Sequence, residues 1–472
     1  MRRFILISVF AVCVLAASAQ GGVQEASPTV AQAGMQGASQ AGAQEGGMPE
    51  KWTLRDCIDH ALEHNIELRQ RALEVKGAEI DLNTAQNSRL PNLSARVGQD
   101  FSFGRKAFES GDSYVFRNTQ AAGTSFGMSA EMPVFQGFRI NNQIKAGRLD
   151  MQAATAGLDE ARQNMELNIA GFFLDALLKK EILAVATEQT ALTTQQMDNT
   201  RLMVDAGKLP LSQLYEIEAA WARDTAAEVR AEGDVELALL ALAQALDLEN
   251  SAAFDVSEPD IDISAYYEIP LSPESVYDTA LATKPAVREA ELLLESSRHG
   301  VRVAQSARWP SLSLGASVGD NYEYMFGQSG QQSFADQMRN RHSENIGLNL
   351  SIPIFNRNAT RNSVRTARLG VENRILALEG VRLALHKEVQ QAWQGALTAR
   401  ASWEATLLAS IAARESFRAT ELRYTAGKAT VYEYSEAAKM LFESQSEQAR
   451  SKYEFLFRTR ILDFYAGVPI DF

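Results

Sequence analysis

The sequence predicts a mainly α-helical protein with membrane-crossing β-strands, built from a helix-strand-strand-helix unit that occurs twice. Three observations support this fold class. The chain of 472 residues matches itself at a nearly constant shift, four segments alternate apolar and polar side chains, and two very long stretches show helical periodicity without a proline. We therefore expect a doubled domain that combines strands with paired helices.

The duplication is visible in short motifs that recur 219 or 220 residues later. Three pairs of motifs carry the match: Arg89–Ser94 with Arg308–Ser313, Met132–Phe135 with Ile352–Phe355, and Ala206–Lys208 with Ala426–Lys428. Because this period far exceeds that of solenoid repeats, it indicates a doubled domain. We place the first repeat at residues 50–249 and the second at 272–472, with residues 250–271 between them.

The N-terminal part of the chain is predicted to be a signal peptide followed by a leader. Two arginines precede an apolar run, and Ala17-Ser18-Ala19 has the small-residue pattern of a cleavage site, so residues 1–19 read as a signal peptide. Cys13 lacks the small preceding residues of a lipidation site. Residues 20–49 are rich in Ala, Gln and Gly, and we expect a disordered leader there.

Each repeat opens with helices and continues into two strands. A short helix, at 54–65 or 274–283, leads into a second helix that ends before Pro91 or Pro310. The four strands are expected at about residues 91–104, 122–135, 310–326 and 345–355. Alternation over about ten residues matches membrane-crossing strands better than buried ones, with half-exposed strands of a soluble sheet as the alternative.

A helical hairpin follows each strand pair, at about residues 139–247 and 358–465. The first helix of each hairpin is proline-free and would reach roughly 95–100 Å at the standard helical rise. Each ends at an Ala-Gly-Lys turn, where glycine can adopt the left-handed cap and lysine faces the negative end of the helix dipole. The other helices of each repeat add up to nearly the same length, which predicts a rod of paired helices.

Composition excludes several classes of protein. The formal net charge is −13, so no basic excess is available to neutralise nucleic-acid phosphates. Two cysteines are too few for a disulfide framework or a cysteine-based zinc site. Leu237–Ala243, within the best apolar run after the signal peptide, is too short to cross a membrane as a helix.

Four strands in one chain cannot close a membrane barrel, so several chains must contribute. Two chains would give eight strands with a filled interior, whereas three would give twelve strands with a lumen. The predicted wet lining comprises Ser94, Arg96, Asp100, Ser125, Ser129, Glu131 and Asn349. A predicted aromatic girdle, with ordinary packing as the alternative, comprises Phe101, Phe103, Tyr322, Tyr324 and Phe326.

The duplicated order of motifs resembles the TolC-type outer-membrane efflux proteins. The resemblance covers about residues 52–470 and rests on the WTLRDCIDHAL opening, the helices ending at R-x-P, the M/I-P-V/I-F strand exits and the A-G-K turns. It implies a homotrimer in the outer membrane, with a twelve-stranded β-barrel continued by a long periplasmic α-helical barrel. It also implies an equatorial region, to which residues 250–270 and the C-terminal segment are expected to contribute, and docking to a periplasmic adaptor (membrane fusion) protein and an inner-membrane pump.

The function expected from this resemblance is an outer-membrane channel-tunnel of a tripartite efflux or secretion system, embedded in outer-membrane lipid and without a cofactor. A periplasmic adaptor and a passive porin are the alternatives. An adaptor would not need two pairs of amphipathic strands, and a porin does not explain helices approaching roughly 100 Å.

The two turns are candidate docking sites for the adaptor. They comprise Gly207, Lys208 and Leu209 in the first hairpin and Gly427, Lys428 and Ala429 in the second. The prediction rests on two points. The turns lie at the end of the predicted rod of helices that is farthest from the strands, and members of the resembled family have short glycine turns at that end. The alternative is that both lysines only cap helices.

A candidate gate lies next to the second turn. By resemblance, Glu433 and Glu436 align with the acidic pair that constricts the periplasmic mouth, and Tyr424 aligns with a tyrosine that ties the closed state. Gln213 stands where a partner aspartate can occur, and Ala429 where an arginine can occur, so the locking bonds must differ. The alternative is that both acids are ordinary partners of a helix dipole.

One motif suggests an enzyme. His60-Ala61-Leu62-Glu63-His64 fits the H-x-x-E-H pattern of some zinc peptidases. The matching positions of the second repeat are Thr279 and Thr283, and no third ligand follows from the pattern. Surface histidines are the favoured interpretation, and we expect neither a metal site nor catalysis.

Overall fold

The computed structural model describes residues 51–248, 254–259, 267, 272–468 and 470. The predicted signal peptide and leader, and most of residues 250–271, lie outside the described residues. The described chain divides into two compact units. The strand unit comprises Ala78–Asp150 and Glu295–Asn373, and the helical unit comprises the rest.

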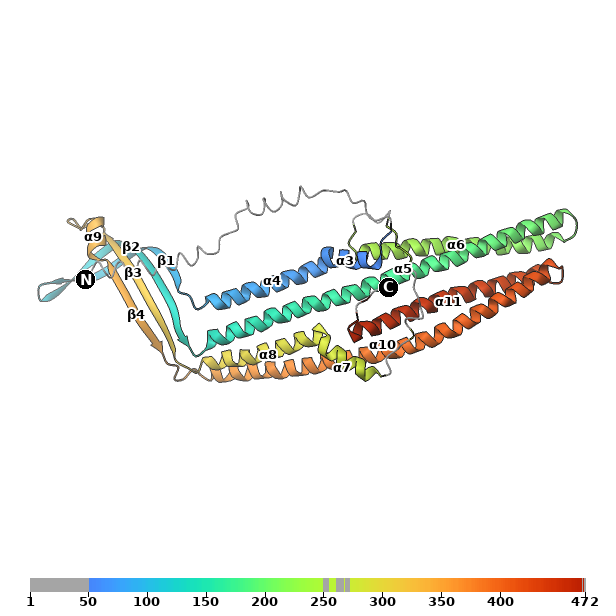
Figure 1. Ribbon diagram of the computed structural model, residues 1–472. Coiled ribbons are helices and arrows are strands. Elements are labelled where there is room, and N and C mark those ends of the chain that lie inside the picture. The colour runs from blue at the N-terminus through green and yellow to red at the C-terminus, as the bar shows by residue number, and fades with distance from the viewer. Residues whose placement is uncertain (1–50, 249–253, 260–266, 268–271, 469, 471–472) are drawn as a thin grey trace, which may run out of the picture. The chain divides into compact units, whose positions relative to one another are not determined.

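Apart from α9, the described elements follow the same order in both halves of the chain (Figure 1). The first half contains α3 (Leu54–His64), α4 (Ile66–Asn87), β1 (Asn92–Ser110), β2 (Ser113–Gln136), α5 (Arg139–Asp205) and α6 (Leu211–Ala245). The second contains α7 (Pro273–Thr283), α8 (Pro285–Ser306), β3 (Ser311–Met325), α9 (Phe334–Asn340), β4 (Ser343–Ser351), α10 (Ala359–Thr425) and α11 (Val431–Ala466). Both long helices, α5 and α10, have 67 residues. Among the described helices, none has an apolar stretch long enough to cross a membrane.

The strands form one antiparallel sheet in the order β1-β2-β3-β4. The register aligns side chains of one kind across all four strands. One row of partners runs Ser94, Ser129, Ser317 and Asn345, and the adjacent row runs Leu93, Ala130, Ala316 and Ile346. Because successive side chains point to opposite faces, the sheet has one small, polar face and one apolar face over this part of its length.

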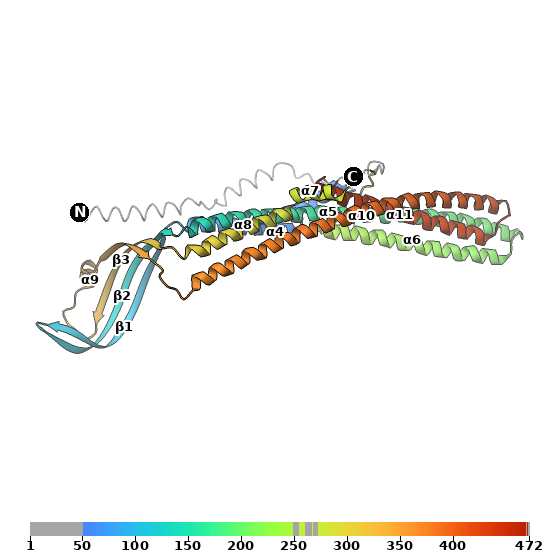
Figure 2. The same ribbon diagram turned by 90° about the horizontal axis from the view of Figure 1, so that it is seen from below.

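The strands and their connections differ from the sequence-based prediction in three places. β1 and β2 have 19 and 24 residues and continue through residues 105–121, which lay outside the predicted strands, to a tight turn at Gly111. This hairpin extends past the other strands (Figure 2). In residues 105–121 the apolar side chains stand at consecutive positions, at Ala107-Phe108 and at Tyr114-Val115-Phe116, so the period of two that indicates a strand is missing there. β4 ends at Ser351, before Pro353, which cannot donate a ladder hydrogen bond.

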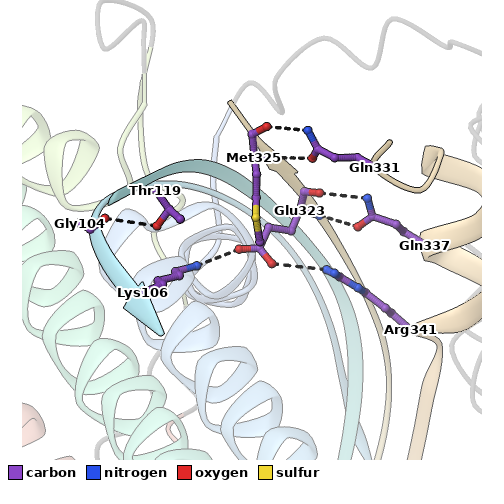
Figure 3. A network of polar contacts seen from close by, with 8 residues as sticks. All are labelled: Gly104, Lys106, Thr119, Glu323, Met325, Gln331, Gln337 and Arg341. Atoms are coloured by element: carbon purple, nitrogen blue, oxygen red, sulfur yellow. Dashed lines mark hydrogen bonds and ion pairs between the residues drawn. The ribbon is translucent and has the colours of Figure 1, made fainter. Parts of the chain in front are cut away.

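The third difference is α9, which protects the exposed edge of β3. β3 has 15 residues and β4 only nine, so the last residues of β3 pair with β2 on one side and have no strand on the other. The side-chain amide of Gln337 accepts from Glu323 N at 3.0 Å and donates to Glu323 O at 3.0 Å. Gln331 does the same for Met325, at 2.7 and 2.6 Å (Figure 3). Two glutamine side chains thus replace the missing strand, which removes an open edge.

Replacing Gln337 by leucine should break the two hydrogen bonds that satisfy the edge of β3 at Glu323. Gln337 is 3% exposed, so a leucine there would cover the backbone N–H and C=O of Glu323 without offering either group a hydrogen bond. We expect a loss of about 1–3 kcal/mol for each unsatisfied group. Amide hydrogen exchange at Glu323 should become faster. The exposed neighbour Gln332, changed to leucine, is the matched control, and equal exchange in the two variants would contradict the assignment.

The core of the helical unit joins distant parts of the chain. Its largest buried cluster includes Phe173 of α5, Leu242 of α6 and Val256, each at most 1% exposed. Trp52 pairs with Val256 as an isolated parallel bridge, with Trp52 N donating to Asp255 O at 2.9 Å. These contacts fix the segment that precedes α3 against the ends of the hairpin helices.

Candidate functional site

The first hairpin turn is held by its own backbone. Gly207 N donates to Val204 O at 2.8 Å, and Lys208 N donates to Met203 O at 2.9 Å. This is the Schellman pattern, and it requires a left-handed residue after the helix. Gly207 supplies it with φ of +73°. The exposed Lys208 therefore caps α5 through its backbone amide, and its ammonium is not needed for the turn.

The second turn repeats this geometry. Gly427 has φ of +70°, Gly427 N donates to Tyr424 O at 2.9 Å, and Lys428 N donates to Arg423 O at 2.8 Å. Lys428 is exposed and Ala429 half-buried, as Lys208 and Leu209 are in the first turn. Among the described residues neither lysine has an ion-pair partner. Both ammonium groups are therefore available to another molecule.

Glu433 forms a capping box at the start of α11. Thr430 Oγ1 accepts from Glu433 N at 3.2 Å, and the carboxylate accepts from Thr430 N at 2.7 Å. The bond from the Thr430 amide holds the pKa of Glu433 below its ordinary value. Glu436 is exposed and has no ion pair within the described chain. Gln213 occupies the matching place in α6, after Pro210, which offers no side-chain cap.

Tyr424 joins the two hairpins. Its hydroxyl lies 3.4 Å from Thr200 Oγ1 of α5, and its ring centre lies 5.2 Å from that of Tyr434 in α11. The structure therefore brings Tyr424 to Thr200 and Tyr434. Among the contacts of the described residues, none joins Tyr424 to Gln213, Glu433 or Glu436.

Thr200 belongs to a buried polar seam that the sequence analysis missed. The seam on α5 consists of Gln189, Thr193, Gln196 and Thr200, each 8% exposed or less. Asp224 of α6 accepts from Thr193 Oγ1 at 2.6 Å and from Gln189 Nε2 at 3.1 Å. These polar residues recur at intervals of three and four along the sequence, a spacing that could have predicted a polar stripe on one face of the helix. Buried polar pairs between helices favour one register, so the seam helps to set the register of α5 against α6.

The H-x-x-E-H histidines do not assemble into a metal site in the described part of the chain. His60 and His64 stack with ring centres 4.3 Å apart, and the edge of His60 packs against Trp52. No group of three or more His, Cys, Asp or Glu residues suited to a metal ion occurs among the described residues. Burial raises the pKa of Cys57 to about 12, so its thiol stays protonated at neutral pH.

A half-buried lysine fastens the end of α11 to the junction of α7 and α8. Lys284 Nζ lies 3.0 Å from the ring centre of Phe464 and donates to Gln163 Oε1 at 3.2 Å. Burial lowers the pKa of Lys284 to about 8, against the opposing attraction of Glu166, Glu388 and Glu160. In the first repeat the matching junction uses Asn65, whose amide donates to Asp247 Oδ2 at 3.4 Å.

Lys284 should make stability rise with pH from about 8 to 10.5. In this window the unfolded chain binds more protons than the folded one, so the free energy of unfolding increases with pH. Chemical unfolding followed by circular dichroism should show a smaller rise for Lys284→Met than for Lys387→Met, an exposed control. Burial also raises the pKa of Tyr465, to about 12. Both variants keep this tyrosine, so its contribution to the pH dependence drops out of the comparison. Equal slopes in the two variants would contradict this role.

Comparison with known proteins decides the family. The sequence model of the family described as outer membrane efflux protein matches residues 57–247 and 276–467. The chain belongs to this family. Protein CyaE of Bordetella pertussis is 25% identical over 422 residues, covering 88% of this chain and 83% of CyaE. Outer membrane protein TolC of Escherichia coli is 22% identical over 420 residues, covering 85% of this chain and 80% of TolC.

Solved structures show the same fold at low identity. The CmeC outer membrane channel of Campylobacter jejuni has a TM-score of 0.75 at 17% identity, covering 88% of this chain and 85% of CmeC. The outer membrane protein VceC of Vibrio cholerae has a TM-score of 0.70 at 17% identity, covering 88% of this chain and 96% of VceC.

Family membership confirms the predicted fold class, function and location. The protein is an outer-membrane channel of the efflux or secretion type, with membrane strands and a large periplasmic helical part. Its family consists of transport channels rather than enzymes. The adaptor and passive porin alternatives are not supported.

Proposed function

We propose that three copies of this channel assemble into one conduit, which docks a periplasmic adaptor and inner-membrane pump at the hairpin turns and is gated beside them. The observation that carries the assembly is the four-stranded sheet, whose outer strands β1 and β4 each leave one edge unpaired within the described chain. In hydrocarbon, backbone groups without partners are too costly, so sheets close.

The sheet also has the surface that lipid requires. On its apolar face Val97, Ile346 and Leu348 are 61–71% exposed in the single chain. Pairing β4 of one copy with β1 of the next would satisfy both edges and turn these side chains toward lipid. Three copies give twelve strands, enough to leave a lumen lined by the small, polar faces of the three sheets, whereas two copies give eight strands and a filled interior.

Light scattering in detergent tests the assembly. After correction for the micelle, we expect a single species with three times the mass of one chain, stable on dilution because the β1 and β4 edges are paired. A chain in which Leu348 is replaced by proline is the comparison, because it loses a backbone donor in β4. A monodisperse monomer or dimer of the unchanged protein would rule out the trimer.

The turns support docking because they present accessible charge on a rigid backbone. Both glycine caps are complete without the lysine side chains, and Lys208 and Lys428 are exposed. In a trimer of duplicated chains, six such turns would lie at one end of the conduit. An adaptor with an acidic or polar tip would complement this ring of ammonium groups.

The gate proposal rests on the carboxylates beside the second turn. Glu433 and Glu436 lie three residues apart near the start of α11, so they occupy neighbouring positions on the helix. In a trimer six carboxylates would surround the periplasmic opening, which favours cations and binds divalent ions. Gln213 would contribute an uncharged polar group from α6, and Tyr424 would tie the hairpin of α10 and α11 to α5 through Thr200.

A further inference from the structure

The helix ends next to the sheet carry only basic charge. Residues 87–92, 137–149, 296–310 and 353–371 contain no Asp or Glu, although the whole chain has a net charge of −13. The same segments contain eleven basic residues, here called the basic collar: Arg89, Arg139, Lys145, Arg148, Arg298, Arg302, Arg308, Arg357, Arg361, Arg365 and Arg368. The collar therefore concentrates one sign of charge beside the strands of an otherwise acidic protein.

The collar is not neutralised within the described chain. All eleven side chains are exposed, and none forms an ion pair with another described residue. Where these side chains do have partners, the partners are neutral, as for Arg89 with Asn141 at 2.8 Å and Arg139 with Gln136 at 2.6 Å. A concentration of unpaired positive charge attracts an anionic surface or ligand.

One part of the collar forms a cleft that also has an apolar wall. The cleft has a volume of about 400 Å³ and lies where α8 leads into β3 and β4 leads into α10. Arg308 and Arg361 line it together with Asn356, and Pro353, Ile354 and Phe355 form its apolar side. Ile354 is 95% exposed and Phe355 78% exposed, values that water alone would disfavour for such large apolar side chains.

The chemistry of this cleft matches an anionic phospholipid. A guanidinium group binds phosphate oxygens through two parallel hydrogen bonds, and two guanidinium groups beside an apolar wall suit a molecule with a phosphate head and acyl chains. The cleft adjoins the strand ends that lead into the periplasmic helices. In an outer-membrane channel, phospholipid headgroups of the periplasmic leaflet lie at this level.

We propose that Arg308 and Arg361 bind the phosphate of an anionic phospholipid of the periplasmic leaflet, with its acyl chains against Ile354 and Phe355. The other collar residues attract the anionic headgroups of the same leaflet electrostatically, at longer range. This inference rests on the outer-membrane location of the channel and does not require the proposed trimer, docking turns or gate.

Lipid retention tests the proposal. The full-length protein is exchanged into nanodiscs of phosphatidylcholine with a minor fraction of phosphatidylglycerol, released into mild detergent, and its bound lipid is counted by native mass spectrometry. We expect the wild type to retain phosphatidylglycerol selectively. Arg308→Gln/Arg361→Gln should retain at most about one tenth of the phosphatidylglycerol that the wild type retains. Arg308→Lys/Arg361→Lys should fall between the two, because it keeps the charge and loses the paired hydrogen bonds.

The matched control is Arg414→Gln/Arg418→Gln, which removes two exposed arginines near the far end of α10. It should retain as much phosphatidylglycerol as the wild type. Circular dichroism checks that all variants keep their helical content. Equal retention by the Arg308/Arg361 variant and the control would overturn the proposal, as would equal uptake of phosphatidylcholine by the wild type. Displacement of the lipid by inorganic phosphate would assign the cleft to free phosphate instead.

Discussion

Replacing Glu433 and Glu436 together by alanine should remove the cation preference of the channel and its block by magnesium. In a trimer the change deletes six carboxylates from one narrow opening, so the field that attracts cations there collapses. Single-channel conductance in lipid bilayers, with and without magnesium, measures both properties. We expect the ratio of cation to anion permeability to fall toward unity and the divalent block to disappear.

Two variants separate gating from helix capping. Thr430→Ala breaks the capping box, at about 1 kcal/mol, but keeps both carboxylates. Gln213→Ala changes the matching position of α6 and removes no charge. Both should keep the cation preference and the magnesium block. If the double glutamate variant behaves like these two controls, Glu433 is only a cap and the gate lies elsewhere.

Reversing the charge of Lys208 and Lys428 should weaken adaptor docking. The Schellman bonds use backbone amides, so Lys208→Glu/Lys428→Glu leaves both turns intact while it reverses six exposed charges in a trimer. We expect crosslinking to the adaptor to fall by about tenfold, because like charges facing each other are costly at an interface. Efflux by cells carrying the variant should fall with it, at unchanged yield of the assembled channel.

The matched control reverses two lysines away from the turns. Lys76 of α4 and Lys387 of α10 are exposed and have no ion pair within the described chain. Lys76→Glu/Lys387→Glu therefore makes the same change of net charge and should keep crosslinking and efflux at the level of the unchanged channel. If the turn variant also keeps both, the lysines are helix caps and the adaptor contacts another surface.

The glycine turns and the capping box of the candidate site could be predicted from the sequence. The glycine of each Ala-Gly-Lys turn was predicted to be left-handed, and both have positive φ. The capping box was also readable, because threonine followed three residues later by glutamate is its signature, although Glu433 had been interpreted only as a dipole partner or gate. These features involve residues within one turn of helix, so a short stretch of sequence contains all of their partners.

The sequence by itself determined the order of elements apart from α9, the faces of the strands and the two glycine turns, because periodicity and turn chemistry are local. Only the tertiary structure decided which distant groups meet. The amides of Gln331 and Gln337 complete the edge of β3, and Tyr424 reaches Thr200. Lys284 lies on the ring of Phe464, whereas the first repeat uses Asn65 and Asp247 at the same junction. Such pairings depend on how long helices and unequal strands are placed side by side, and no local pattern encodes that placement.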